Sequence, residues 1–160
     1  MLNLSMTMLP NAAARGITVA GSTLHRDFDR ARRRAAWLHL KAKITGQQDD
    51  LLWLAMVRES TGPLNESYRG VKTIDVDRII GSESRATEFN RDFLPRKRHL
   101  DARWSRVNSA FREDVSLPPI RVFELEGDYF VRDGNHRVSV AKYYGVKCID
   151  AEVVLLAPCG

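Results

Sequence analysis

The feature that most restricts how this chain can fold is an abrupt change from strand to helix near its C-terminal end. Tyr129 to Val131 is rich in β-forming residues, and a helical pattern that ends at Gly145 follows within a few positions. The expected inner face of that helix consists of Val138, Val140, Ala141 and Tyr144. A helix that begins so soon after a strand requires a sharp turn between the two.

The segments on either side of this turn extend the pattern. Ile120 to Leu125 is a second β-rich run, and Glu126 to Asp128 separates it from the strand at Tyr129 as a tight hairpin would. Cys148 to Leu155 predicts a closing strand. The C-terminal part of the chain is therefore predicted to be a strand-hairpin-helix-strand unit of a mixed α/β fold.

The turn itself, from Asp133 to Arg137, has the composition of an anion-binding site. The first N–H groups of a helix have no intrahelical acceptor, and the positive end of the helix dipole lies behind them. Gly134 lets the backbone approach a phosphate, and Arg137, His136 and Ser139 offer donors to its oxygens. Two roles stay open for Asp133: it holds Mg²⁺ or accepts a proton, or it caps the helix and orients Arg137.

The rest of the chain divides into three parts. Residues 1–22 are small and weakly patterned, which predicts a disordered leader. Residues 23–66 are predicted to form a helical extension, in which a helix ended by Gly46 pairs with a second helix over Asp49 to Glu59 as a hairpin. Residues 67–156 are predicted to form the α/β domain. The apolar stripe of the first helix consists of Leu24, Phe28, Ala31, Ala35, Leu38 and Ala42.

Within the α/β domain, Val71 to Val76 predicts a strand and Ser84 is placed to cap a helix from Arg85 toward Phe93. Another helix is predicted from apolar residues at spacings of four, three and four, namely Leu100, Trp104, Val107 and Phe111. The tryptophans Trp37, Trp53 and Trp104 are expected to pack in the interior or between helices.

Basic residues concentrate in two of the predicted helical regions. His25 to Ile44 and Arg91 to Arg112 each hold seven Lys or Arg residues against two Asp. Such stretches attract a polyanion, but solvated faces of packed helices have the same composition and are the commoner case. No apolar run approaches the roughly 20 residues of a membrane span, and no signal peptide is recognisable. The chain is therefore expected to be cytoplasmic, with no membrane partner.

Residues Gly127 to Val138 resemble the core of the ParB/sulfiredoxin superfamily, in which a hairpin delivers a D-G-x-H-R-type loop to a helix N-terminus. Asp77 to Ser82 is similar to that family's first conserved box, and the chain from Leu24 resembles a bacterial group of ParB-domain proteins with a helical preface. The resemblance implies a ParB/sulfiredoxin-like small mixed sheet with helices, preceded by the N-terminal helical hairpin. Asn135 stands where sulfiredoxins carry their reactive cysteine, so sulfiredoxin-type repair is not expected.

The closest version of the loop is the D-G-H-H-R of the free serine kinases, although Asn135 replaces its first histidine. The resemblance therefore implies a nucleotide-binding domain that uses Mg²⁺ with ATP, ADP or CTP, either a kinase for a small hydroxyl compound or a nucleotide hydrolase. The implied catalytic residues are Asp133, Glu83 and His136, with Asp133 also holding the metal. The implied phosphate- or nucleotide-binding residues are Gly134, Asn135, His136, Arg137, Ser139, Ser82 and Arg85.

Two alternatives accompany this reading. Glu83 is equally well explained as a favourable charge in the first turn of a helix. The alternative function is a DNA-associated binding module, or a ParB-like nuclease or regulator, whose two basic helices hold the DNA.

Overall fold

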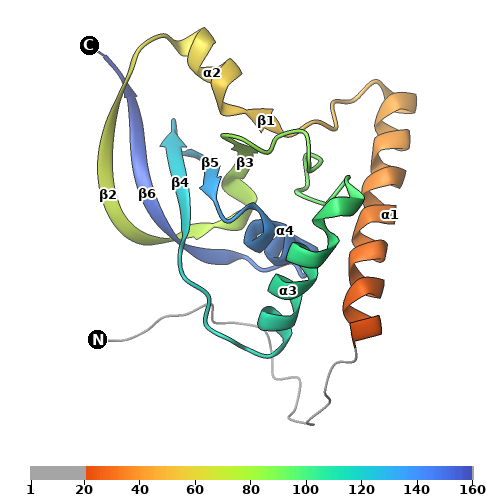
Figure 1. Cartoon of the computed structure of the whole chain (residues 1–160). Coiled ribbons are helices and arrows are strands. Elements are labelled where there is room, and N and C mark those ends of the chain that lie inside the picture. Colours follow the sequence, from red (N-terminus) through yellow and green to blue (C-terminus); the bar gives the residue numbers. More distant parts are fainter. Residues whose placement is uncertain (1–20, 160) are drawn as a thin grey trace.

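The strands predicted in the C-terminal half assemble into one mixed sheet. The computed structural model describes residues 21–159. Its sheet has six strands in the order β1-β3-β5-β4-β6-β2 (Figure 1). Neighbouring strands are parallel in the pairs β1/β3, β3/β5 and β4/β6, and antiparallel in β4/β5 and β2/β6. The strands are β1 (Leu52–Trp53), β2 (Leu64–Asp75), β3 (Ile79–Ser82), β4 (Ile120–Leu125), β5 (Asp128–Asp133) and β6 (Cys148–Pro158).

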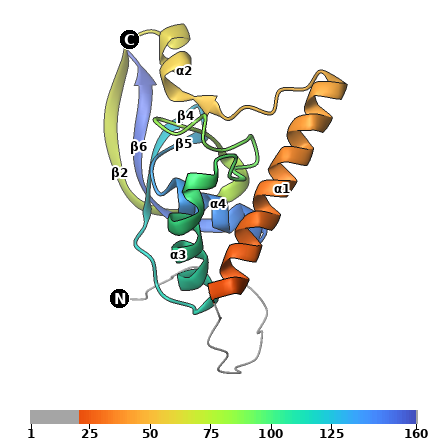
Figure 2. The ribbon, with the colours of Figure 1, turned by 45° about the vertical axis from the view of Figure 1, so that its right-hand side comes forward.

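Helices cover both faces of this sheet. In residues 21–159 the α-helices are α1 (Gly21–Thr45), α2 (Leu54–Thr61), α3 (Asp101–Arg112) and α4 (Asn135–Tyr143), and 3-10 turns occur at Val76–Arg78 and Arg98–Leu100. In Figure 2, α1, α3 and α4 lie together on one side of the sheet, and α2 lies apart from them. Over the same residues, no helix is both long and apolar enough to cross a bilayer. The chain thus folds as the mixed α/β class that the sequence predicts.

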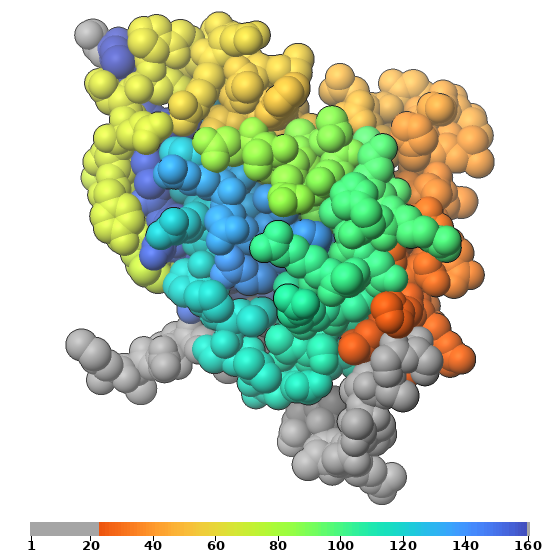
Figure 3. Space-filling model, in the orientation of Figure 1, coloured from red at the N-terminus to blue at the C-terminus, as the bar shows by residue number. Residues whose placement is uncertain are grey.

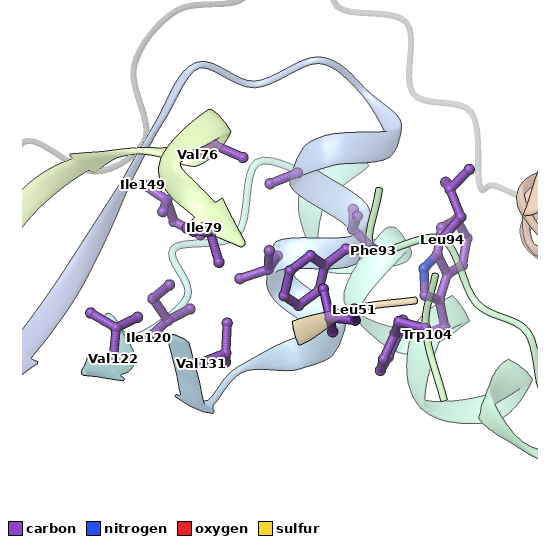
Figure 4. Packing of buried hydrophobic residues seen from close by; sticks show 14 of the residues in the cluster. Leu51, Val76, Ile79, Phe93, Leu94, Trp104, Ile120, Val122, Val131 and Ile149 are labelled. Carbon is purple, nitrogen blue, oxygen red and sulfur yellow. The ribbon is translucent and has the colours of Figure 1, made fainter. Parts of the chain in front are cut away.

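The main core lies between the sheet and the helices α1, α3 and α4. Trp104 is fully buried there, and its ring meets Phe28 of α1 edge to face at 5.7 Å. Alternate residues of the strands, such as Val122 and Val131, face this core, which Figure 4 shows from close by. Their neighbours face the other side, where Phe130 packs with Leu54 of α2 in a smaller cluster.

Several predicted elements are confirmed. The expected hairpin joins β4 to β5, and its two turn residues, Glu126 and Gly127, have φ of 53° and 87°, as a two-residue hairpin of this hand requires. The helix predicted around Leu100 to Phe111 is α3. The short helix that follows Gly134 is α4, and the closing strand is β6. The hairpin and the two helices depend on contacts between near neighbours in the sequence, whereas β6 pairs with the distant strands β2 and β4.

The predicted N-terminal helical hairpin is wrong. The second helix begins at Leu54, and its buried side chain packs on the face of the sheet opposite α1. The two residues before it form β1, in which Leu52 pairs with Gly81 and Trp53 with Ser82 of β3. Without β1, the backbone N–H and C=O groups at this edge of β3 would be unpaired. The pairing of β1 with β3 satisfies them and places α2, which follows β1 directly, away from α1.

The helix predicted from Arg85 toward Phe93 is also wrong, because this segment is an irregular loop. The buried side chain of Asn90 accepts hydrogen bonds from the amides of Asp92 (3.1 Å) and Leu94 (2.8 Å). Phe93 between them has a φ of 56°, in the left-handed region. Bonds of a side chain to the backbone compete with helix formation, and here they determine the conformation of the loop.

The boundaries predicted after residues 22 and 66 lie inside α1 and β2. The leader at residues 1–22 lies outside the described residues except for its last two positions, which begin α1. The boundary expected between residues 66 and 67 falls inside β2. Trp37 is also not where the sequence places it, because its side chain is exposed on α1, whereas Trp104 is buried as predicted.

Candidate functional site

The ends of two neighbouring parallel strands define the candidate site. β3 and β5 run side by side in the same direction, with Ser82 opposite Val131. The residues after β3, Glu83 to Arg85, therefore lie at the same edge of the sheet as the turn that follows β5. Ligands of α/β sheets commonly bind at the carboxyl ends of parallel strands. The two segments that the sequence singled out, some fifty residues apart, are thus brought together.

Gly134 makes the turn from β5 into α4 possible. Its φ is 104°, and a Cβ at this position would lie 2.6 Å from Cγ2 of Ile120, which leaves no room for a side chain. The Val138 amide donates to the Gly134 carbonyl at 3.0 Å, so α4 is hydrogen-bonded from its first turn. The amides of the residues before Val138 belong to the helix end that has no intrahelical acceptors.

A buried hydrogen bond joins the two strand ends. The Ser82 hydroxyl donates to Oδ1 of Asn135 at 2.8 Å and also accepts from the Arg85 amide at 3.3 Å. Both Ser82 and Asn135 are buried. These two residues, which the sequence predicts as phosphate ligands, hold the turn of β5 against the turn of β3.

Ser139 is likewise placed away from any ligand. Its side chain is fully buried, and its hydroxyl accepts the indole N–H of Trp104 at 2.9 Å. The Ser139 hydroxyl is therefore engaged with Trp104 and is not exposed at this edge of the sheet. The reason is the helical period, which turns this position of α4 toward α3 and the core.

His136 has the most unusual surroundings of the predicted residues. Only 7% of its surface is exposed, and its ring meets Phe89 edge to face at 5.6 Å. Neither ring nitrogen has a hydrogen-bond partner among the described residues. Burial, together with the charges of Arg103 and Arg85, lowers the pKa of His136 to about 4. The imidazole is therefore neutral at pH 7, and it keeps one donor and one acceptor unused.

Cationic side chains surround His136. Arg85 donates to Glu88 at 2.7 Å, and the same carboxylate lies 3.5 Å from Nε2 of His99. Burial alone would raise the pKa of Glu88, but the hydrogen bond and charge of Arg85 bring it below its ordinary value. Arg103, at the start of α3, has no carboxylate within 4.0 Å among residues 21–159. The positive charge of Arg85 and Arg103 near His136 thus exceeds the negative charge of Glu88.

Arg137 connects three segments of the fold. Its Nη1 donates to the carbonyl of Pro118 and, at 3.0 Å, to that of Pro119, and its Nη2 donates to Oδ2 of Asp133 at 3.0 Å. Its side chain is mostly buried, whereas that of Asp133 is mostly exposed. Of the two roles left open for Asp133, the structure shows the pairing with Arg137 but no capping bond from its side chain to α4. Arg137 therefore has few donors left for a phosphate.

The carboxylates that were expected to hold a metal do not form a closed cage. Among residues 21–159 no group of three or more Asp, Glu, His or Cys side chains has the arrangement of a metal site. Glu83 is exposed, and its carboxylate lies 3.9 Å from Nε of Arg132. Oδ1 of Asp133 makes no hydrogen bond within the described chain. The carboxylates of Glu83 and Asp133 therefore suit Mg²⁺ only when phosphate oxygens and water supply its remaining ligands.

A cavity adjoins this corner of the molecule. Its volume is about 190 Å³, and Arg137 forms part of its wall together with Phe111, Pro118, Val140 and Asp150. Most of this lining is apolar, which suits a flat or aliphatic part of a ligand.

Three residues of the site have no signal in the sequence. Glu88, His99 and Arg103 reach the surroundings of His136 from the irregular loop, from the 3-10 turn at Arg98–Leu100 and from α3, respectively. They lie more than thirty residues before it. No spacing rule connects positions so far apart, and the packing of Phe89 against His136 is among the tertiary contacts that place the loop there.

Comparison with protein-family models finds no match, and comparison with curated proteins finds none either. Among solved structures, the chain is similar to sulfiredoxin from Arabidopsis thaliana at 16% sequence identity, with a TM-score of 0.38. The match covers 53% of this chain and 84% of that one. A likeness this slight assigns no activity, so function has to be argued from the residues of this chain.

Proposed function

We propose that this chain binds the phosphate groups of a nucleotide at the edge where β3 and β5 end. The proposal rests on His136, a buried imidazole in the first turn of a helix whose two nitrogens have no hydrogen-bond partner within residues 21–159. A buried polar group without partners destabilises the fold by about 1–3 kcal/mol. Such a group is understandable where a ligand supplies the missing hydrogen bond.

The charges around His136 indicate that the ligand is an anion. Arg85, Arg103 and His99 lie near the imidazole, against the single carboxylate of Glu88. The N-terminal end of α4 adds the positive end of a helix dipole and free amides. Phosphate combines the charge and the number of acceptors that this set of donors requires. The apolar cavity beside Arg137 gives the remainder of a nucleotide a surface to contact.

Phosphoryl transfer is the chemistry that the carboxylates of this edge would serve. Asp133, with phosphate oxygens and water, would hold Mg²⁺, and Glu83 would accept the proton of an attacking hydroxyl from a small alcohol or water. Both side chains are exposed at the same edge of the sheet, so a second substrate has access to them. Asp133→Asn and Glu83→Gln are then expected to abolish release of ADP or phosphate while nucleotide binding persists.

The test of nucleotide binding is calorimetry with ATP, ADP and CTP, with and without Mg²⁺, on the parent chain and on His136→Leu. Because neither ring nitrogen bonds to any residue that the structure describes, this substitution leaves none of their groups unpaired. Loss of a hydrogen bond to a charged phosphate is expected to weaken binding by roughly 10- to 100-fold. His39→Leu is the matched control, since His39 is exposed and lies beside Asp49.

Two outcomes would refute the proposal: no heat of binding with any of the nucleotides, or equal affinity of the parent chain and His136→Leu. The DNA-binding alternative is separated by salt. Affinity that depends on several phosphate contacts falls steeply as the salt concentration rises, whereas that for a single nucleotide falls far less. If the chain binds a DNA duplex with an affinity that falls steeply with salt concentration, and binds no nucleotide, the alternative is favoured.

A further inference from the structure

The outward face of α1 carries large apolar side chains that nothing in the described chain covers. Trp37 is 59% exposed, Leu40 58% and Ile44 78%. They are spaced by three and four residues, which places them in one row along the helix. In Figure 3, α1, coloured red to orange, forms the right flank of the molecule. Clustered exposed apolar side chains of this size mark interaction surfaces.

The same row continues toward the N-terminal end of α1 with arginines. Arg26, Arg30 and Arg33 precede Trp37 at spacings of four, three and four residues, and all are exposed. None of the three has a carboxylate within 4.0 Å among residues 21–159, and the one bond from an Arg33 nitrogen goes to the Asp29 carbonyl at 3.3 Å. The opposite stripe of the helix, with Phe28 and Ala35, is buried.

The six residues of the row are Arg26, Arg30, Arg33, Trp37, Leu40 and Ile44, called the α1 seam below. Alternating steps of four and three are the spacing with which one helix packs along another. The seam is cationic over its first half and apolar over its second. A helix that fits it therefore needs carboxylates along one half and apolar side chains along the other.

We propose that the α1 seam binds an acidic amphipathic helix of a partner protein. Carboxylates of the partner would pair with the three arginines, which have no carboxylate within 4.0 Å in the described part of the chain. Apolar side chains of the partner would cover Trp37, Leu40 and Ile44, which removes their surface from water. Lys41, whose Nζ lies 5.5 Å from the centre of the Trp37 ring, stands beside the junction of the two halves and adds to the positive charge.

Other occupants fit the seam less well. A second copy packed in parallel would place arginine against arginine, and one packed antiparallel would place arginine against Trp37, Leu40 or Ile44. A nucleic acid would use the arginines but has nothing to bind the exposed aliphatic side chains of Leu40 and Ile44. A membrane would bring the arginines to the same depth as the apolar residues, because both lie on one line along the helix.

The test uses a synthetic helical peptide as long as α1, with Glu at the first three seam positions and Leu at the last three. Binding to the full chain is measured by fluorescence anisotropy of the labelled peptide. The double variant Arg30→Glu/Arg33→Glu is expected to weaken binding by at least about tenfold, and a peptide with Lys in place of Glu is expected to restore it. Leu40→Ser/Ile44→Ser should weaken binding of both peptides.

The controls are Met56→Ser and Arg106→Glu, which alter an exposed apolar residue of α2 and an exposed arginine of α3. Both are expected to leave peptide binding unchanged. No binding of the Glu peptide, or equal binding of the Glu and Lys peptides by the parent chain, overturns the proposal. So does binding of a DNA duplex or of phosphatidylserine vesicles in place of the peptide, or a dimer in sedimentation that Leu40→Ser/Ile44→Ser dissociates.

Discussion

Protonation of His136 should make the free energy of unfolding depend on pH in a way that one substitution removes. Burial and the nearby arginines lower the pKa of His136 to about 4 in the folded chain, whereas the ordinary value of 6.5 applies when the chain is unfolded. Folding therefore favours the neutral imidazole. The stability that depends on this neutral form is fully present above pH 6.5, and it is lost as the pH falls from 6.5 toward 4.

The size of this loss follows from the two pKa values. Between about pH 7 and about pH 5 the unfolded chain takes up a proton that the folded chain does not, and the free energy of unfolding falls by roughly 2 kcal/mol. His136→Leu cannot take up this proton, so its own loss over the same range should be smaller by that amount. Leucine also removes two buried nitrogens that have no hydrogen-bond partner among the described residues, so at neutral pH the variant should be as stable as the parent chain or more stable.

The assay is urea unfolding at both pH values, followed by tryptophan fluorescence, for the parent chain and His136→Leu. The change in the free energy of unfolding with pH is compared between the two proteins. The contributions of the carboxylates and of the remaining histidines cancel in this difference, because both proteins share them. An equal loss with pH in the two proteins would refute the buried, neutral state of His136. Proton NMR gives an independent check, because His136 must titrate far below the ordinary 6.5, and a bound nucleotide phosphate must raise its pKa.

Three further predictions concern stability and are checked by the same unfolding assay. Gly134→Ala should destabilise the fold more than Gly145→Ala: both positions have positive φ, which costs roughly 1–2 kcal/mol, but only Gly134 lacks space for a Cβ. Alanine at Ser82, at Asn135 and at both should reveal a coupling energy of about 1 kcal/mol, and additive effects would contradict their hydrogen bond. Asn90→Ala should cost about 2–3 kcal/mol, because two amides of the irregular loop lose their acceptor; a loss below about 1 kcal/mol would contradict that role.

Elements governed by neighbouring residues could be predicted from the sequence. The hairpin at Glu126 and Gly127 follows from turn chemistry, and α4 follows from its short apolar pattern after Gly134. The apolar stripe of α1 is buried where the helical period places it, with Phe28 and Ala35 almost inaccessible. In each case the deciding interactions connect residues only a few positions apart.

Elements governed by distant partners could not be predicted in this way. The residues before α2 are compatible with a helix, but Leu52 and Trp53 become a strand because β3 offers them a free edge. The loop around Asn90 is compatible with a helix too, but the buried side chain of Asn90 binds the loop's own amides. Trp37 lies opposite the buried stripe of α1, and it is exposed because α2, which the sequence predicts to pair with α1, packs elsewhere on the sheet.

For the candidate site, the sequence by itself determined the local geometry: a strand, a glycine with positive φ at position 134, and a helix that begins at once. The tertiary structure decided which side chains remain available to a ligand. Arg137 donates to the carbonyls of Pro118 and Pro119, while His136 is buried near Arg103 and has no hydrogen-bond partner in the described part of the chain. Turn geometry is set by backbone sterics within a few residues, whereas hydrogen-bond satisfaction and local charge are set by whatever chain segments pack around a group.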